Sequence, residues 1–186
     1  RTPDRKDFGI PPEGKTVLDK CIEKGLPAAG VGKIKDIFSG KGINAHYAAH
    51  GNAECFEATI KALEEYKNGL IFTNLVDTDM LYGHRNDATG YSEEMERVDT
   101  FLFKLANKMT SNDILIVTSD HGCDPNYYTT DHTREYVPLM VYGQSIKSVA
   151  LGTLEGFNNV ADIIVEHLNL PPYRVNTLYF NIQQMN

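Results

Sequence analysis

The spacing of hydrophobic positions along this chain changes several times between the period of a strand and that of a helix. Near-continuous apolar runs at 70–76 (LIFTNLV) and 113–119 (DILIVTS) are typical of strands covered on both faces of a parallel sheet. A small-residue run near 27–34 and the run 136–142 (YVPLMVY) predict two further strands, and Pro138 favours an edge or irregular position for the second. Apolar residues spaced by three and four predict helices at about 16–24, 52–66, 92–109 and 158–169.

The order of these elements predicts an α/β fold, with a largely parallel sheet flanked by helices. Thr16, Asn52 and Ser92 are the expected N-caps of three helices, because their side chains can accept a hydrogen bond from the first turn. Ligands of such sheets bind beyond the carboxyl ends of the strands. We therefore expect the functional residues in the segments that follow 70–76 and 113–119.

The composition is that of an ordinary soluble globular protein: 41% of the 186 residues are hydrophobic and 23% are charged. The net charge of −7 argues against a nucleic-acid or anionic-membrane binder, and no apolar run approaches the ~20 residues that span a bilayer. Three scattered cysteines predict a reduced, cytoplasmic protein rather than a disulfide scaffold. The polar start (RTPDRKDFG) is not a secretory signal, and without an initiating Met it suggests a fragment or a processed chain.

Residues 9–16 (GIPPEGKT) match the phosphate-loop pattern GxxxxGK[ST], which would predict a nucleotide site. Such a loop works between a buried strand and a helix, where free backbone N–H groups bind the phosphate. Here charged residues precede the pattern, and Pro11 and Pro12 remove two of those N–H groups. We interpret the segment as a turn before a helix that Thr16 caps.

Carboxylate and imidazole side chains recur after the two buried strands. The candidate metal ligands are Asp79, His84, Asp120, His121 and His132. These donors suit Mn²⁺, Mg²⁺ or Zn²⁺. Gly122 permits the turn that would let an adjacent Asp and His face one ion. Two ions ~4 Å apart would need more ligands than these five, so water, substrate or another segment of polypeptide would complete the shells.

The remaining histidines fit a site less well. His46 and His50 lie in a polar segment that we expect to be a turn. His167 lies in the last turn of a predicted helix, where the helix dipole favours a cation. We interpret all three as structural or solvated. A single Asp-His pair would also be common in a surface turn, so the metal-site prediction depends on several candidate ligands occurring together.

Three longer motifs, NLVDTDMLYGHRND, TSDHGCDP and TDHTREYVPLMVYG, resemble phosphopentomutase, a family of the alkaline phosphatase superfamily. The resemblance extends over nearly the whole chain and implies an alkaline-phosphatase-like core, present in part. It implies that Asp79, His84 and His132 hold one Mn²⁺, while Asp120 and His121 hold a second. The side chains that it places at the substrate are cationic: Lys33, Arg85 and Arg134.

Members of this family interconvert ribose or deoxyribose 1-phosphate and 5-phosphate through a phosphorylated threonine and a bisphosphate intermediate. The resemblance implies that residues 1–12 are a linker returning from an absent cap domain and that 13–186 are the C-terminal portion of the metal-binding core. The family's nucleophilic threonine and first metal-binding Asp belong to an N-terminal half. We therefore expect that half and the cap as partners in the same protein, and we expect the isolated chain to be inactive.

Two other functions stay open at this point. A phosphoglycerate mutase or a phosphatase of the same superfamily would share the DxxxxH and DH arrangement, although LYGHRND and TDHTREYVPL favour the pentomutase. A non-catalytic metal-binding or interaction module is an alternative from another class, because this polypeptide lacks a nucleophile.

Overall fold

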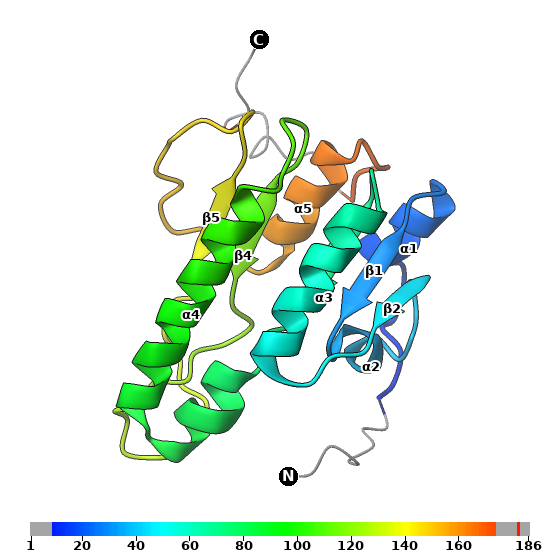
Figure 1. Ribbon diagram of the computed structural model, residues 1–186. Coiled ribbons are helices and arrows are strands. Elements are labelled where there is room, and N and C mark those ends of the chain that lie inside the picture. Colours follow the sequence, from blue (N-terminus) through cyan, green and yellow to red (C-terminus); the bar gives the residue numbers. More distant parts are fainter. Residues whose placement is uncertain (1–8, 174–181, 183–186) are drawn as a thin grey trace. The chain divides into compact units, whose positions relative to one another are not determined.

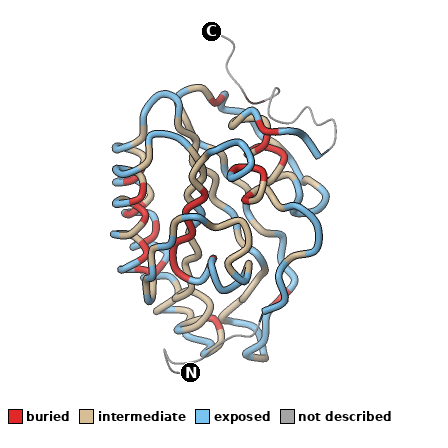
Figure 2. The backbone as a smooth tube through the Cα atoms, turned by 90° about the vertical axis from the view of Figure 1, so that its right-hand side faces the viewer, coloured by how far each residue is buried: buried red, intermediate tan, exposed pale blue. Residues whose placement is uncertain are grey.

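A short apolar strand, β1 (Ala28–Val31), is the central strand of a parallel sheet in the computed structural model, which describes residues 9–173 and 182 (Figure 1). It pairs with β2 (Ala45–Tyr47) on one side and with β3 (Leu70–Thr73) on the other, so the order is β2-β1-β3. All four residues of β1 are buried, as expected for a strand covered on both faces, and Figure 2 shows where buried segments lie along the chain.

Four named helices belong to the same unit as this sheet, whose described residues lie within 1–74 and 148–183. They are α1 (Val17–Glu23), α2 (Ile34–Ile37), α3 (Gly51–Glu65) and α5 (Asn158–His167). The hydrophobic core joins the two stretches of sequence, because Leu18 of α1 clusters with Val165 and Leu170, all at most 5% exposed. Burying each such side chain contributes about 1.5–3 kcal/mol.

Helix α1 begins with a reciprocal pair of hydrogen bonds between Thr16 and Asp19. Asp19 N donates to Thr16 Oγ1 (3.3 Å), and Thr16 N donates to Asp19 Oδ2 (2.7 Å). The prediction that Thr16 caps this helix is confirmed. Lys15, the lysine of the phosphate-loop pattern, forms an ion pair with Glu23 of the same helix (2.6 Å). The segment therefore serves the helix start, as we interpreted it.

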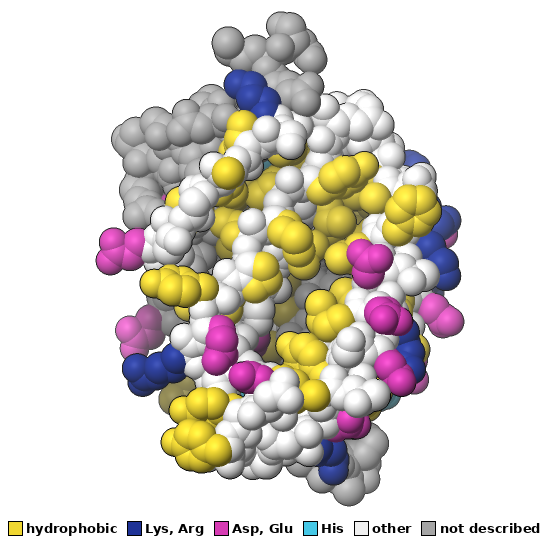
Figure 3. Space-filling model, turned by 90° about the vertical axis from the view of Figure 1, so that its left-hand side faces the viewer, with side chains coloured by type: hydrophobic (Ala, Val, Ile, Leu, Met, Phe, Trp, Pro, Cys, Tyr) yellow, Lys and Arg dark blue, Asp and Glu magenta, His cyan; other side chains and the backbone are white. Residues whose placement is uncertain are grey.

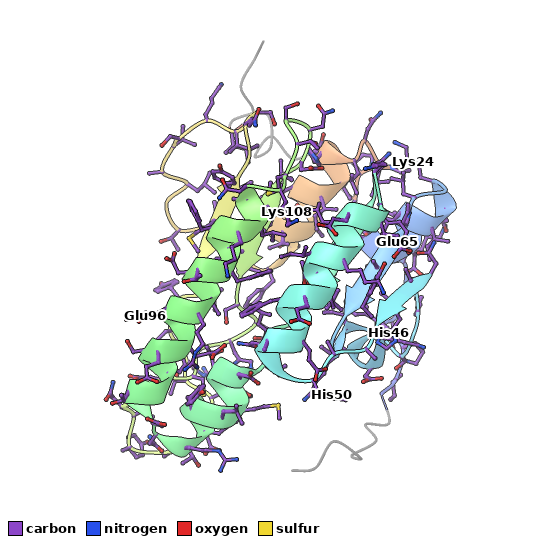
Figure 4. The ribbon with its side chains drawn as sticks, viewed as in Figure 1. Lys24, His46, His50, Glu65, Glu96 and Lys108 are labelled. Atoms are coloured by element: carbon purple, nitrogen blue, oxygen red, sulfur yellow. The ribbon has the colours of Figure 1, made fainter. Side chains whose placement is uncertain are left out.

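Two lysines join α1 to the C-terminal end of α5. Lys24, labelled in Figure 4, donates from Nζ to the carbonyl oxygens of Leu168 (2.9 Å) and Asn169 (2.5 Å). Lys20, only 8% exposed, donates to the carbonyl oxygen of Pro171 (2.5 Å). The last carbonyls of a helix have no acceptor role inside it. Two lysine side chains at the C-terminal end of α1 therefore satisfy carbonyl groups at and just after the end of α5.

The second unit, whose described residues lie within 75–147, contains α4 (Ala88–Ala106) and two strands, β4 (Leu115–Thr118) and β5 (Leu139–Tyr142). The two strands pair antiparallel. Exposure alternates along β5, so that Met140 and Tyr142 face solvent, and Phe103 of α4 is also exposed. Figure 3 shows hydrophobic side chains reaching the surface among acidic ones on one face of the molecule.

The predicted α/β fold, with a largely parallel sheet flanked by helices, is confirmed. Two of the predicted N-caps are wrong. His50 is the N-cap of α3, so Asn52 is a buried residue inside the first turn. Helix α4 begins well before Ser92, because Asp87 Oδ1 accepts a hydrogen bond from Gly90 N (2.9 Å).

The two histidines labelled in Figure 4 differ from expectation in one respect. His46 lies in β2 rather than in a turn, with Nε2 3.5 Å from the carbonyl oxygen of Gly32. His50 immediately precedes α3, and its side chain makes no capping hydrogen bond. Among the described residues, no helix combines the length and the apolar character that crossing a membrane would require.

Candidate metal centre

Asp79 and His84 lie in an irregular helical segment made of η1 (Thr78–Tyr82), a π-helix, and η2 (Gly83–Arg85), a 3₁₀ turn. In a regular α-helix, side chains five residues apart point about 140° away from each other. The irregular turns instead place Asp79 Oδ1 3.4 Å from His84 Nε2. Single π-helical turns occur frequently at functional sites. The backbone here departs from regular helix where two candidate donors converge.

The two Asp-His segments are joined by a short antiparallel bridge between Gly122 and Thr133. Thr133 N donates to the carbonyl oxygen of Gly122 (3.0 Å), and Asp124 N donates to Thr133 Oγ1 (2.9 Å). Glycine is required at 122, because a Cβ there would lie 2.9 Å from the Thr133 carbonyl oxygen. His121 and His132 each precede one end of the bridge, and their rings stack with centroids 3.6 Å apart.

The Asp79 carboxylate lies beside a row of imidazoles. Its Oδ1 is 3.2 Å from His132 Nε2, and the His132 ring lies between those of His84 and His121 at centroid distances of 4.8 Å and 3.6 Å. Oδ1 is buried and has no hydrogen-bond partner within the described part of the chain. An unsatisfied buried acceptor costs about 1–3 kcal/mol. A cation among these donors would remove that cost.

Backbone carbonyls orient two of the imidazoles. His84 Nδ1 lies 2.5 Å from the carbonyl oxygen of Thr130, and His121 Nδ1 lies 3.1 Å from that of Gly122. Because a carbonyl can only accept, Nδ1 carries the proton in each ring. In the neutral imidazole this leaves the Nε2 lone pair available to a metal ion, which is how metal-binding histidines are usually held.

The candidate donor atoms form two overlapping groups that share Asp79. One group adds His84 and Cys123, and the other adds His121 and His132. Within each group, all ligand atoms lie within 4.8 Å of one another. Asp, His and Cys are the side chains that bind divalent metal ions, so either group could hold one.

The structure thus brings together four of the five donors predicted from the sequence. Asp120 is next to His121, with Oδ1 3.6 Å from Nε2, but its side chain is 75% exposed. Arg85 and Arg134 are exposed residues of the same unit. Lys33 belongs to the other unit, where it is the N-cap residue of α2.

Sequence reasoning missed Cys123 as a donor and Asn86 as a structural residue. Asn86 has a left-handed backbone (φ 53°) at the end of η2. Its Nδ2 donates to three carbonyl oxygens, those of Pro125 (3.2 Å), Tyr127 (2.7 Å) and Thr129 (3.2 Å). The amide therefore holds the loop that leads to Thr130, whose carbonyl orients His84. Only the position of Cys123, two residues after His121, could have been noticed in the sequence.

Negative groups accumulate around these donors. Burial raises the pKa of the Cys123 thiol to about 11, and the charge of Asp79 adds to the effect. The pKa of Tyr91 is also raised, by burial and then by neighbouring acidic groups that include Asp79 and Asp124. Burial disfavours any charge, but the acidic neighbours Asp79, Asp124 and Glu135 favour a bound cation. The electrostatics therefore agree with a divalent metal ion at this place.

Among known protein families, a family model described as the Metalloenzyme superfamily matches residues 23–172. Similar sequences include phosphopentomutases of Carboxydothermus hydrogenoformans (50% identical over 92% of this chain and 45% of that protein) and Thermotoga maritima (44% identical over 98% and 47%). The chain therefore spans a little under half the length of these relatives.

Solved structures share the fold at low sequence identity. A phosphoglycerate mutase of Leishmania mexicana aligns with 86% of this chain and 38% of its own (TM-score 0.67, 20% identity). The PH0037 protein of Pyrococcus horikoshii aligns with 66% of this chain and 34% of its own (TM-score 0.53, 20% identity). At this identity the likeness establishes the fold alone, and it agrees with an alkaline-phosphatase-like core that is present in part.

Proposed function

Because this chain belongs to the Metalloenzyme superfamily, we propose that it is the C-terminal portion of the metal-binding core of a phosphopentomutase. Relatives of that name, at 42–50% identity, support the proposal. The observation that carries it is the Asp79 carboxylate, whose buried and unpartnered Oδ1 faces the Nε2 atoms of His84 and His132. In a purely structural carboxylate this buried oxygen would instead be hydrogen-bonded.

We propose that these donors hold two hard divalent ions, Mn²⁺. Asp79, His84 and His132 would hold the first ion, and Asp120 and His121 would hold the second. The bound ions would supply positive charge to the transferring phosphoryl group and to the attacking and leaving oxygens. The exposure of Asp120 is consistent with a second site that another part of the protein completes.

The chain's own side chains would bind and orient the substrate, a pentose phosphate. Lys33, Arg85 and Arg134 are proposed to pair with its phosphate groups, in a protein whose net charge of −7 would otherwise repel them. The carbonyl of Thr130 holds His84 in the tautomer that a metal requires.

The remaining parts of the reaction lie in the rest of the proposed enzyme. The phosphorylated threonine would come from an N-terminal half, linked through a cap domain to residues 1–12, and residues 13–186 would be the core portion. Ribose or deoxyribose 1-phosphate and 5-phosphate would interconvert through a bisphosphate. The proposed setting is the cytoplasm.

The test compares the complete protein that carries this chain with its Asp79→Asn variant. We expect Mn²⁺-dependent conversion of ribose 1-phosphate to ribose 5-phosphate, reduced at least ~100-fold in the variant because one ion loses the carboxylate whose buried Oδ1 faces the imidazoles. Asp99→Asn, at an exposed position of α4, is the matched control and should keep the wild-type rate. Turnover of 3-phosphoglycerate instead of the pentose phosphate, or full activity of Asp79→Asn, would contradict the proposal.

A further inference from the structure

Cys123 adds a sulfur donor to a centre that is otherwise made of oxygen and nitrogen. Its Sγ lies within 4.8 Å of the ligand atoms of Asp79 and His84. The other two cysteines, Cys21 and Cys55, belong to the other unit and are fully buried there. Cys123 is therefore the one cysteine, of the three in the chain, whose sulfur accompanies candidate metal ligands.

The sulfur of Cys123 packs against Gly83, where the absence of a side chain leaves room for it. Gly83 precedes His84, and a Cβ at Gly83 would lie 2.5 Å from Cys123 Sγ and 3.2 Å from its Cβ. Because Gly83 has an ordinary negative φ (−57°), the glycine is not needed for its backbone conformation. Its missing side chain instead lets the thiol approach the turn that carries His84. The packing fixes Sγ beside the same donors that would hold a hard ion.

We propose that Asp79, His84 and Cys123 form a mixed oxygen, nitrogen and sulfur site that binds thiophilic divalent ions, namely Co²⁺, Zn²⁺ and Cd²⁺, with Cys123 Sγ as a direct ligand. The inference rests on the proposed metal-binding function and extends it to a second class of ion. Thiolate and imidazole are the preferred donors of these ions, whereas Mn²⁺ and Mg²⁺ prefer oxygen.

The binding step is an exchange of a proton for a metal ion. The S–H bond of Cys123 breaks, the proton passes to solvent, and a bond forms between Sγ and the ion. No electron is transferred. A divalent ion would also neutralise the negative charge of Asp79 next to the new thiolate. The Cys123 sulfur atom would thus make the site prefer Co²⁺, Zn²⁺ and Cd²⁺ over ions that bind oxygen donors only.

The experiment is a titration of the metal-free complete protein with Co²⁺, followed by absorption. Visible d–d bands report bound Co²⁺ whatever its ligands, whereas a near-ultraviolet sulfur-to-cobalt band reports a thiolate ligand. We expect both bands to saturate together in the wild type and in Cys55→Ser, the matched control from the other unit. In Cys123→Ser the sulfur band should disappear. Affinity for Cd²⁺ should fall at least ~10-fold, while affinity for Mn²⁺ stays within about twofold.

Three results would overturn the inference. Visible bands without a sulfur band in the wild type would exclude Cys123 as a ligand and leave the proposed hard-metal site standing. Equal losses of Mn²⁺ and Cd²⁺ affinity in Cys123→Ser would mean that the thiol only positions Asp79. No Co²⁺ binding at all would reject the mixed site and also count against the proposed function. The wild-type spectrum decides the first point even if the variant fails to fold.

Discussion

We expect a substitution of Asn86 to affect both stability and metal binding. Its exposed side-chain amide donates to three backbone carbonyls of the loop beside the metal centre. The informative change is Asn86→Gly, which removes the amide, adds no charge and keeps a backbone that tolerates φ of 53°. An amide has two N–H donors, so at most two full hydrogen bonds are lost, at about 0.5–1.5 kcal/mol each. Glycine recovers up to about 1 kcal/mol of left-handed strain. We expect a net loss of about 1 kcal/mol in the free energy of unfolding.

The same change should weaken metal binding more than it weakens the fold. The loop held by Asn86 leads to the carbonyl of Thr130, which orients His84. Loss of an outer contact of this kind typically lowers metal affinity by about 10–100-fold. Urea unfolding of the metal-free protein and calorimetric titration with Mn²⁺ measure the two effects separately.

The chain contains a matched control for the backbone part of this change. Asn169 has nearly the same left-handed conformation (φ 52°), at the end of α5 in the other unit. Asn169→Gly should therefore be neutral or slightly stabilising and should leave Mn²⁺ affinity unchanged. If the two glycine variants behaved alike in both measurements, the reasoning about the Asn86 amide would be refuted.

Three further predictions concern single residues. Thr16→Ala should lower the free energy of unfolding by about 1 kcal/mol, because the reciprocal cap of α1 is lost, whereas Thr153→Ala at an exposed site should have no effect in the same urea titration. Gly122→Ala should cost about 1–3 kcal/mol and weaken Mn²⁺ binding, because the new Cβ would press on the Thr133 carbonyl; an unchanged melting temperature would contradict this. Burial raises the pKa of Cys21 from 9.0 to about 11, so the contribution of this thiol to stability should be fully present below pH 9 and be lost between pH 9 and 11, because the unfolded thiol ionises first. Cys21→Ala should flatten that slope, and an identical slope would reject the assignment.

Most strands and longer helices could be predicted because each segment carries its own hydrophobic spacing. The short elements α2 and β2 could not, and the antiparallel pairing of β4 with β5 depends on contacts that spacing does not encode. Helix starts were harder, since Asp87 and Ser92 are both good capping residues and lie five positions apart. Asn86 has a left-handed backbone that ends η2, so the next helix can begin at once with Asp87, and not Ser92, as its N-cap. That turn is irregular, and no periodic pattern in the sequence signals a π-helix.

The types of donor could also be predicted, whereas the contacts that assemble them could not. Asp79 and His132 are 53 positions apart in the numbering, yet their donor atoms lie 3.2 Å apart. Two sets of long-range contacts bring the donor segments together. They are the bridge between Gly122 and Thr133, and the hydrogen bonds from the Asn86 amide to three carbonyl oxygens. Neither has a local signature, because each pairs ordinary backbone groups with residues distant in the sequence.

The lysine contacts between α1 and α5 have a consequence for how the chain is made on the ribosome. Lys20 is synthesised 151 residues before its partner Pro171, a delay of roughly 7–30 s at about 5–20 residues per second. During that time the apolar face around Leu18 has no Val165 or Leu170 to cover it and is open to chaperones. The intervening residues 75–147 belong to the other unit, so the nascent chain can complete its metal-ligand region after α1 has met β1 but before α5 is added to the same core.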